Sequence, residues 1–204
     1  MLFTDTYKTI SGLSGGVYRD KGSKFLSFAE PVKSTEEIKR LLDKYKKEYH
    51  DARHHCYAYM LGYDKSVWRA NDDGEPSGTA GKPILGQINS NDLTNLIIIV
   101  VRYFGGTLLG VSGLINAYRS ASADAISNSK IIECVVRDFY KLEFPYTVIN
   151  DVMRIIKDEN LIQSDQTFGL DCSIKVGLRI STSESLLARF KSVPDLKMKF
   201  IVRQ

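Results

Sequence analysis

The stretch Leu96-Ile97-Ile98-Ile99-Val100-Val101-Arg102 contains the longest apolar run in this chain of 204 residues. It is rich in β-branched residues and does not alternate with polar ones, a pattern that predicts a strand buried on both faces of a sheet. A glycine-rich segment follows at residues 103–110, and residues 112–127 then carry apolar and small side chains at helical spacing. We therefore expect a buried strand, a glycine-rich turn and a helix that lies flat on the sheet.

The sequence before this strand predicts a hairpin, a helix and two short strands. Residues 8–18 and 24–32 are expected to form the hairpin, with a break at Gly22. Ser34 and Glu37 form a capping-box pattern, which predicts a helix that ends near Tyr49. Short strands are expected at 56–61 and 67–70, a turn-rich stretch at 71–81 and a short helix at 82–88.

A second pattern begins after Lys130. It predicts a strand at 135–144, a helix at 147–158, strands at 161–168 and 171–178, a helix at 182–191 and a strand at 198–202. This βαββαβ order is typical of the ferredoxin-like arrangement. Because 204 residues suit two modest domains, we expect an α+β protein with domains at residues 1–137 and 138–204.

Composition excludes several classes of protein. No apolar run is long enough to span a bilayer, and the first residues lack the pattern of a secretion signal, so we expect a cytoplasmic protein. The three cysteines are scattered and form no Cys-x-x-Cys pair, which argues against a disulfide framework or a cysteine-based zinc site. A net charge of +4 argues against a protein that coats nucleic acid electrostatically, so any nucleic-acid contact should be local.

Two adjacent histidines lie at the entrance to one of the short strands, between Arg53 and Cys56. Because side chains alternate along a strand, His54 and Cys56 should lie on one face and His55 on the other. Adjacent strand histidines do not easily bind one metal ion, so the sequence favours one histidine packed inward and one that caps a loop. A histidine near a pocket could also bind phosphate or transfer a proton.

The segment 71–82 concentrates acidic, glycine and hydroxyl residues: Asn71, Asp72, Asp73, Gly74, Glu75, Pro76, Ser77, Gly78, Thr79, Gly81 and Lys82. Its three carboxylates could bind Mg²⁺, or they could pair with nearby arginines, namely Arg53, Arg69 and Arg102. We favour ion pairing, because like charges this close together need partners to stay ionised. The segment is not a phosphate-binding loop, since Pro76 occupies the place of the first glycine.

The segment 102–113 joins the buried strand to a helix, a geometry in which free backbone N–H groups can bind an anion. Two interpretations stay open for Gly105 and Gly106: a tight turn in which side chains would clash, or an anion site. Lys82, Arg102 and Arg119 could supply positive charge in either case. Val111 stands where the Walker pattern has a lysine, which argues against nucleotide hydrolysis.

Aromatic residues nearby could stack on RNA bases, although we expect more of them in the core: Tyr57, Tyr59, Tyr63, Trp68, Tyr103 and Phe104.

Three motifs in this order resemble the signature segments of the IMPACT family: Asp51-Ala52-Arg53-His54-His55-Cys56-Tyr57-Ala58-Tyr59, then Asn71-Asp72-Asp73-Gly74-Glu75-Pro76-Ser77-Gly78-Thr79-Ala80-Gly81-Lys82-Pro83, then Arg102-Tyr103-Phe104-Gly105-Gly106 with Leu109-Gly110. The chain departs from the family pattern at Leu108, Ser112 and Asn116, where lysine, glycine and arginine are usual. The βαββαβ tail is similar to the second domain of bacterial members of this family.

The resemblance implies a first domain with the fold of domain IV of elongation factor G and of a small-subunit ribosomal protein. It implies a second domain like the ferredoxin-like domains of that factor, and both relatives act on RNA. Eukaryotic members have an additional N-terminal domain and restrain a translation-stress kinase by competing for its activator. That activity is not carried over to this chain, which begins at the shared domain.

Our interpretation is an RNA- or ribosome-associated binding protein, a translation or stress regulator, whose functional surface lies within residues 53–119. The binding residues expected for RNA or another anion are Arg53, His54, His55, Asp72, Asp73, Glu75, Ser77, Thr79, Lys82, Arg102, Tyr103, Gly105, Gly106 and Arg119. The partner expected is structured RNA or the ribosome, with no DNA and no membrane. We expect no catalytic residue, no cofactor and no metal.

Two alternatives stay open. One is a small hydrolase or metal-dependent enzyme that uses His54, Asp72, Asp73 and Glu75, and the other is a regulator that binds only proteins. Bacterial relatives are sometimes called proline dipeptidases, but the sequence shows no arrangement of residues typical of a two-metal peptidase site.

Overall fold

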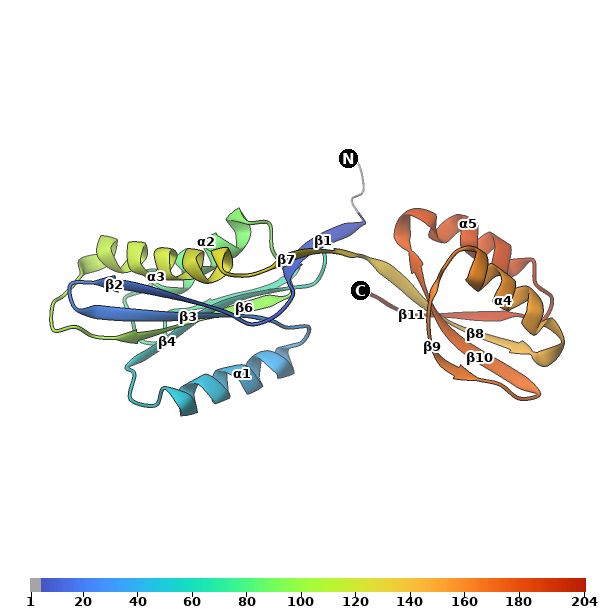
Figure 1. Ribbon diagram of the computed structural model, residues 1–204, viewed down its shortest axis with the longest axis horizontal. Coiled ribbons are helices and arrows are strands. Elements are labelled where there is room, and N and C mark those ends of the chain that lie inside the picture. The colour runs from blue at the N-terminus through green and yellow to red at the C-terminus, as the bar shows by residue number, and fades with distance from the viewer. Residues whose placement is uncertain (1–4) are drawn as a thin grey trace. The chain divides into compact units, whose positions relative to one another are not determined.

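The computed structural model describes residues 5–204, which form two compact units (Figure 1). The first unit is Tyr7–Cys134. The second is Val135–Gln204 together with Asp5 and Thr6. Both combine helices with antiparallel sheets, which confirms the expected α+β class.

The first unit is built on a five-stranded antiparallel sheet with β6 (Leu96–Tyr103) at its centre. The strand order is β2 (Ser14–Asp20), β3 (Ser23–Pro31), β6, β4 (His54–Leu61) and β5 (Val67–Asn71). Every residue of β6 except Tyr103 is buried, so the predicted strand with two buried faces is confirmed. An apolar strand takes the centre because only this position covers both of its faces.

Helices cover both faces of this sheet. α1 (Thr35–Glu48) lies on one face, and α2 (Gly81–Ser90) and α3 (Gly110–Ser127) lie on the other (Figure 1). Ile97 and Ile99 pack on the α1 side, whereas Ile98 and Val100 pack on the side of α2 and α3. One strand therefore contributes to two hydrophobic cores.

Small residues allow α3 to lie close to the sheet, as its sequence predicts. A Cβ on Gly16 of β2 would lie 2.4 Å from the backbone nitrogen of Ala125, so only glycine fits there. Ser27 of β3 donates a 2.6 Å hydrogen bond to the carbonyl oxygen of Ala121. The stripe of small side chains on α3 thus sets the distance between helix and strands.

Two expected strands are each divided in the structure. Residues 8–18 contain the end of β1 (Thr6–Ile10) and the start of β2, and residues 135–144 contain the end of β7 (Ile131–Val135) and most of β8 (Arg137–Pro145). β1 and β7 pair with each other in a separate two-stranded sheet. A strand that changes partner keeps its extended, alternating pattern, so the sequence does not show where the division falls.

The second unit has the βαββαβ order that the sequence predicts. β8 leads through a short 3₁₀ turn (Tyr146–Val148) to α4 (Ile149–Asp158), β9 (Ile162–Thr167), β10 (Asp171–Arg179), α5 (Ile180–Lys191) and β11 (Lys197–Arg203). The antiparallel order β11-β8-β10-β9 is that of a ferredoxin-like sheet. Both helices lie on one face of it (Figure 1), where Leu142 and Ile174 are fully buried.

The second unit holds Asp5 tightly. Arg179 donates two hydrogen bonds to the Asp5 carboxylate, at 2.6 and 2.9 Å, and the backbone nitrogen of Val136 donates to the Asp5 carbonyl at 2.7 Å. The guanidinium of Arg179 holds the pKa of Asp5 far below its usual range. Within residues 5–204, every helix is too short or too polar to cross a membrane.

The expected boundary after Arg137 stays a prediction, since contacts divide the chain between Cys134 and Val135. We expect a fragment of residues 138–204 to unfold cooperatively in urea, because it keeps every strand and helix of the second unit. It should be less stable than a fragment of residues 135–204, which retains Val136. Circular dichroism at increasing urea measures both, and the absence of a cooperative transition in the shorter fragment would refute that boundary.

Candidate functional site

Asp72 ties the loop after β5 to the start of α2. Its carboxylate accepts hydrogen bonds from the backbone nitrogens of Gly78, Ala80 and Gly81 at 2.8, 3.0 and 2.8 Å. The first N–H groups of a helix have no partner within the helix, so this carboxylate caps α2. Burial opposes ionisation of Asp72, but these three hydrogen bonds outweigh it and hold the pKa below its usual range.

Asp73 positions the two histidines. Its carboxylate accepts a 2.7 Å hydrogen bond from the backbone nitrogen of His55, and its carbonyl oxygen lies 2.8 Å from Nδ1 of His54. A carbonyl can only accept, so Nδ1 of His54 carries a proton and donates this hydrogen bond. His55 is buried and donates from Nε2 to the Tyr49 carbonyl at 3.1 Å, and burial lowers its pKa. The predicted alternation of the two side chains is confirmed.

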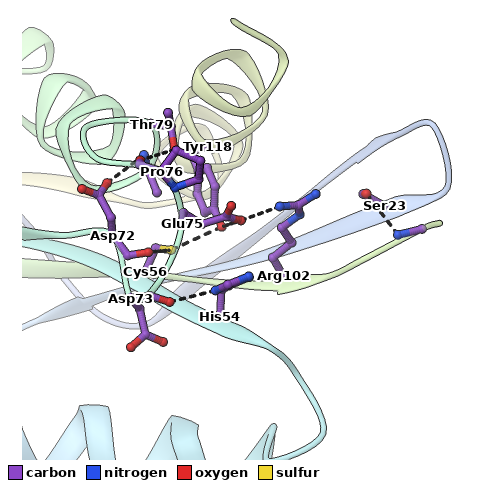
Figure 2. A network of polar contacts seen from close by, with 12 residues as sticks. Ser23, His54, Cys56, Asp72, Asp73, Glu75, Pro76, Thr79, Arg102 and Tyr118 are labelled. Atoms are coloured by element: carbon purple, nitrogen blue, oxygen red, sulfur yellow. Dashed lines mark hydrogen bonds and ion pairs between the residues drawn. The ribbon is translucent and has the colours of Figure 1, made fainter. Parts of the chain in front are cut away.

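Glu75 and Arg102 form a buried ion pair (Figure 2). Nη1 of Arg102 and the hydroxyl of Tyr118 both donate to the same oxygen of Glu75, at 2.6 and 2.8 Å. The sequence favoured pairing between the acidic loop and nearby arginines, and this pair confirms it for Glu75. Because removing one partner of a buried pair strands the other charge, the contact is costly to break, by roughly 3–5 kcal/mol.

Cys56 joins the hydrogen-bonded group formed by Glu75, Arg102 and Tyr118. Its sulfur lies 3.3 Å from the Tyr118 hydroxyl and 3.0 Å from the Asp72 carbonyl oxygen. Burial raises the pKa of both Cys56 and Tyr118 far above their usual ranges. Cys56 is therefore a protonated thiol that holds the network together, and it lacks the thiolate character of a reactive cysteine.

A cavity of about 460 Å³ lies beside the Glu75–Arg102 pair. Arg53 and His54 also line it, and the remaining wall is mostly apolar and comes from the turn after β6 and the first turn of α3. Sequence reasoning had placed the charged residues here but had not identified the apolar wall. One feature of the sequence could have indicated this apolar wall. Leu108 is an aliphatic residue at a position where the family usually has a lysine.

Other expected residues lie away from this cavity. Lys82 and Arg119 line a second cavity, of about 440 Å³, between α2 and α3. Tyr103 packs on the α1 side of the sheet, where its hydroxyl donates to Asp51 at 2.8 Å. Thr79 is buried and donates to the Pro76 carbonyl at 2.7 Å. Ser77 is exposed.

The glycine-rich turn is shaped by close backbone contact. A Cβ on Gly105 would lie 1.9 Å from the carbonyl carbon of Gly22, which itself has a positive φ of 79°. Gly106 has a φ of 86°, a conformation that favours glycine. The interpretation as a tight turn is therefore confirmed at Gly105, and the anion site stays a proposal for the helix that follows.

The side chains named for a metal-dependent enzyme have separate partners. Asp72 caps α2, Asp73 binds the backbone of β4 and Glu75 binds Arg102. Across residues 5–204, no group of three or more histidine, cysteine, aspartate or glutamate side chains is placed to share a metal ion.

Sequence reasoning also missed a row of lysines in the second unit. Lys141 of β8 lies directly opposite Lys175 of β10 and Lys199 of β11 in the strand register. Leu142 and Val176, which follow the first two lysines, belong to the core under α4 and α5, and Met198, which precedes Lys199, packs against it. Because side chains alternate along a strand, the lysines lie on the opposite, uncovered face of the sheet. The three lysines are far apart in the sequence and become neighbours only when β8 pairs with β10 and β11.

We expect the cap that Asp72 forms on α2 to contribute to the free energy of unfolding. Replacing Asp72 with Ala should lower the free energy of unfolding by about 2 kcal/mol at pH 7, because three backbone N–H groups lose a charged acceptor. The folded-state pKa of Asp72 is lowered, so its stabilising effect is complete above the unfolded pKa of about 3.9 and is lost as pH falls through the folded value. Urea unfolding between pH 7 and pH 3 measures both effects.

The matched control is Asp72→Asn, which keeps one acceptor oxygen without the charge. It should unfold with a weaker dependence on pH than the natural chain. Equal stability and equal pH dependence in all three proteins would show that the cap contributes nothing.

Comparisons with known proteins agree with these motifs. The Impact N-terminal domain family matches residues 21–126, which include the capped loop and Arg102. An IMPACT family member from Haemophilus influenzae is 33% identical over 170 residues, covering 81% of each protein. The IMPACT family member YigZ from Escherichia coli is 32% identical over 177 residues, covering 84% of this chain and 83% of that protein.

A solved structure described as the crystal structure of an hypothetical protein has the same overall fold. Its TM-score is 0.75 at 25% identity, and the match covers 98% of this chain and 99% of that one. The family model covers the capped loop and the buried ion pair, and the structural match extends over both units. This chain therefore belongs to the IMPACT family.

Proposed function

We propose that this protein binds structured RNA, on the ribosome, and acts there as a regulator of translation. Membership of the IMPACT family supports a role in translation, through the resemblance of its domains to those of elongation factor G and a ribosomal protein. The observation that carries the RNA contact is the row of Lys175, Lys141 and Lys199 across the uncovered sheet face of the second unit.

Such a row is unfavourable in an isolated sheet, because like charges directly opposite one another destabilise strand pairing. Lys141 has Glu143 at 2.6 Å and Lys175 has Asp165 at 3.8 Å, whereas Lys199 forms no ion pair among residues 5–204. The two existing pairs are at least partly exposed to solvent, and exposed pairs contribute little. Phosphate groups that cross the three strands would relieve the repulsion, which favours a polyanion as the partner.

Phe139 adds an aromatic surface to the same face. Its ring lies against Gly177, where an added Cβ would be 2.9 Å from the ring, and the Lys175 ammonium lies 5.4 Å from the ring centroid. RNA is commonly bound by aromatic side chains that stack on bases beside cations that contact the backbone. The face therefore combines both kinds of contact that single-stranded or looped RNA requires.

Lys82 and Arg119 are a second, smaller cationic surface in the first unit. Both are exposed, and neither forms an ion pair within residues 5–204. Gly78 and Gly86 line the same cavity, and their small size lets a ligand approach the backbone. Arg102 does not belong to this surface, because it is buried against Glu75 and lines the other cavity.

Charge reversal tests the proposal. Lys141→Glu and Lys199→Glu should each weaken binding to ribosomes or structured RNA, and Lys82→Glu combined with Arg119→Glu should weaken it further. Each lost phosphate contact should reduce the slope of log affinity against log salt by about 0.7–0.9. Sucrose-gradient co-sedimentation and filter binding at several salt concentrations give these values.

Matched controls are Lys39→Glu on α1 and Lys191→Glu on α5, because each reverses one exposed lysine away from these surfaces. They should leave binding unchanged. If all variants bind alike, or if binding does not depend on salt, the RNA proposal is wrong and a protein partner becomes the better explanation.

Stacking makes a separate prediction. Phe139→Leu keeps an apolar side chain against Gly177 but removes the aromatic ring, so RNA affinity should fall by about 1–3 kcal/mol. The unfolding midpoint should change little by comparison. Filter binding with a single-stranded and a fully duplex RNA measures the effect, and an equal loss for both would argue against stacking on unpaired bases.

A further inference from the structure

The cavity beside Arg102 has an apolar wall that is left partly open. Phe104, Leu108 and Val111 are 47%, 82% and 60% exposed, and Leu109 and Leu114 lie deeper in the same wall. Exposed apolar side chains gathered around one cavity favour a ligand with an apolar part. A volume of about 460 Å³ is in the range of small-molecule sites.

Arg102 has unused hydrogen-bonding capacity at this cavity. Its Nη1 donates to Glu75 (Figure 2). Its Nε is fully buried and has no hydrogen-bond partner among residues 5–204. Nη2 likewise donates to no group in that part of the chain. Nε and Nη2 form one edge of the guanidinium, which can donate two parallel hydrogen bonds to a carboxylate.

The protein holds this edge in a fixed orientation. The guanidinium carbon lies 5.4 Å from the ring centroid of Phe25 and 5.7 Å from that of Phe104, and Glu75 fixes the opposite side. A planar group held by two rings and an ion pair loses little entropy when it binds a ligand. Arg102 is only 6% exposed, so a bound anion would be largely shielded from water.

The first turn of α3 adds positive potential to the same cavity. Leu109 precedes the helix without a side-chain hydrogen bond to it, and Gly110 and Val111 line the cavity. Free N–H groups at the start of an 18-residue helix favour an anion. Arg53 and His54 complete the polar side.

We propose that this cavity binds a small carboxylic acid with an apolar body. The guanidinium of Arg102 and the start of α3 bind the carboxylate, and Phe104 and Leu108 close over the apolar part. A singly charged carboxylate fits better than a phosphate, because the Glu75 carboxylate beside Arg102 repels a second negative charge more strongly. This inference does not depend on RNA binding, which uses other residues.

Octanoate is a suitable probe, with octan-1-ol as the neutral analogue and acetate as the anion without an apolar chain. Isothermal titration calorimetry on the full chain should show that octanoate binds at least tenfold more tightly than either of the other two. Equal affinity for octanoate and octanol would show that the site recognises no carboxylate. The absence of binding by octanoate at millimolar concentration would overturn the proposal.

Val111→Asp tests the position of the carboxylate. A negative charge in the first turn of α3 is favourable for the helix, so the variant should fold with an unchanged or raised thermal midpoint. It should bind octanoate at least tenfold more weakly, because the new carboxylate repels the ligand. Val111→Asn is the matched neutral control, and it should bind octanoate at least tenfold more tightly than Val111→Asp does.

The experiments distinguish failure of the carboxylate-binding proposal from failure of the RNA-binding proposal. If Val111→Asp binds octanoate as well as Val111→Asn does, the carboxylate does not lie at the start of α3 and the inference is wrong. The Val111 variants should bind RNA like the natural chain, whereas Lys141→Glu should bind octanoate like the natural chain.

Discussion

The ion pair between Glu75 and Arg102 joins three parts of the first unit that are distant in sequence. Glu75 belongs to the loop after β5, Arg102 to the central strand and Tyr118 to α3, and all three meet at one carboxylate oxygen. A charged pair in an apolar interior is stable only when its geometry is good and its partners stay in place. The loop, the strand and the helix are therefore held in one arrangement, and the cavity beside the pair has a defined shape.

The acidic residues of the loop have different tasks, although they lie within four positions of one another. Asp72 caps α2, Asp73 orients the histidines and Glu75 holds Arg102. Each carboxylate has its own donors, which explains how three negative charges coexist in a short segment. The density of acidic residues that suggested a metal site is explained by hydrogen bonding within the protein.

The cavity beside Arg102 in the first unit and the sheet face of the second unit differ in chemistry. The cavity of the first unit is small and largely apolar, with its cations buried or at the rim, which suits a compact ligand. The sheet face of the second unit is open and carries a row of lysines with an aromatic ring beside them, which suits an extended polyanion. The two sites differ in burial, because Arg102 is buried beside Glu75 whereas Lys199 is exposed to solvent.

The order of helices and strands could be predicted from the sequence, apart from the division of β1 from β2 and of β7 from β8, because most elements carry their own local pattern. The run at 96–102 had no polar side to face water, and the capping box at Ser34 marked the start of α1. The family motifs also identified the loop and the glycine-rich turn. The predicted pairing of the acidic loop with an arginine rested on local charge, and it holds for Glu75.

The identity and environment of the site residues depended on tertiary structure. Arg102 was expected to supply positive charge or to pair with the acidic loop, and only the structure shows that it is buried against Glu75. Lys82 and Arg119 line a different cavity because α2 and α3 pack against each other. The lysine row exists only because β8 pairs with β10 and β11, whose lysines lie 34 and 58 positions further along the chain. Local patterns specify what each segment becomes, whereas contacts between segments decide which charges are neutralised and which remain available to a ligand.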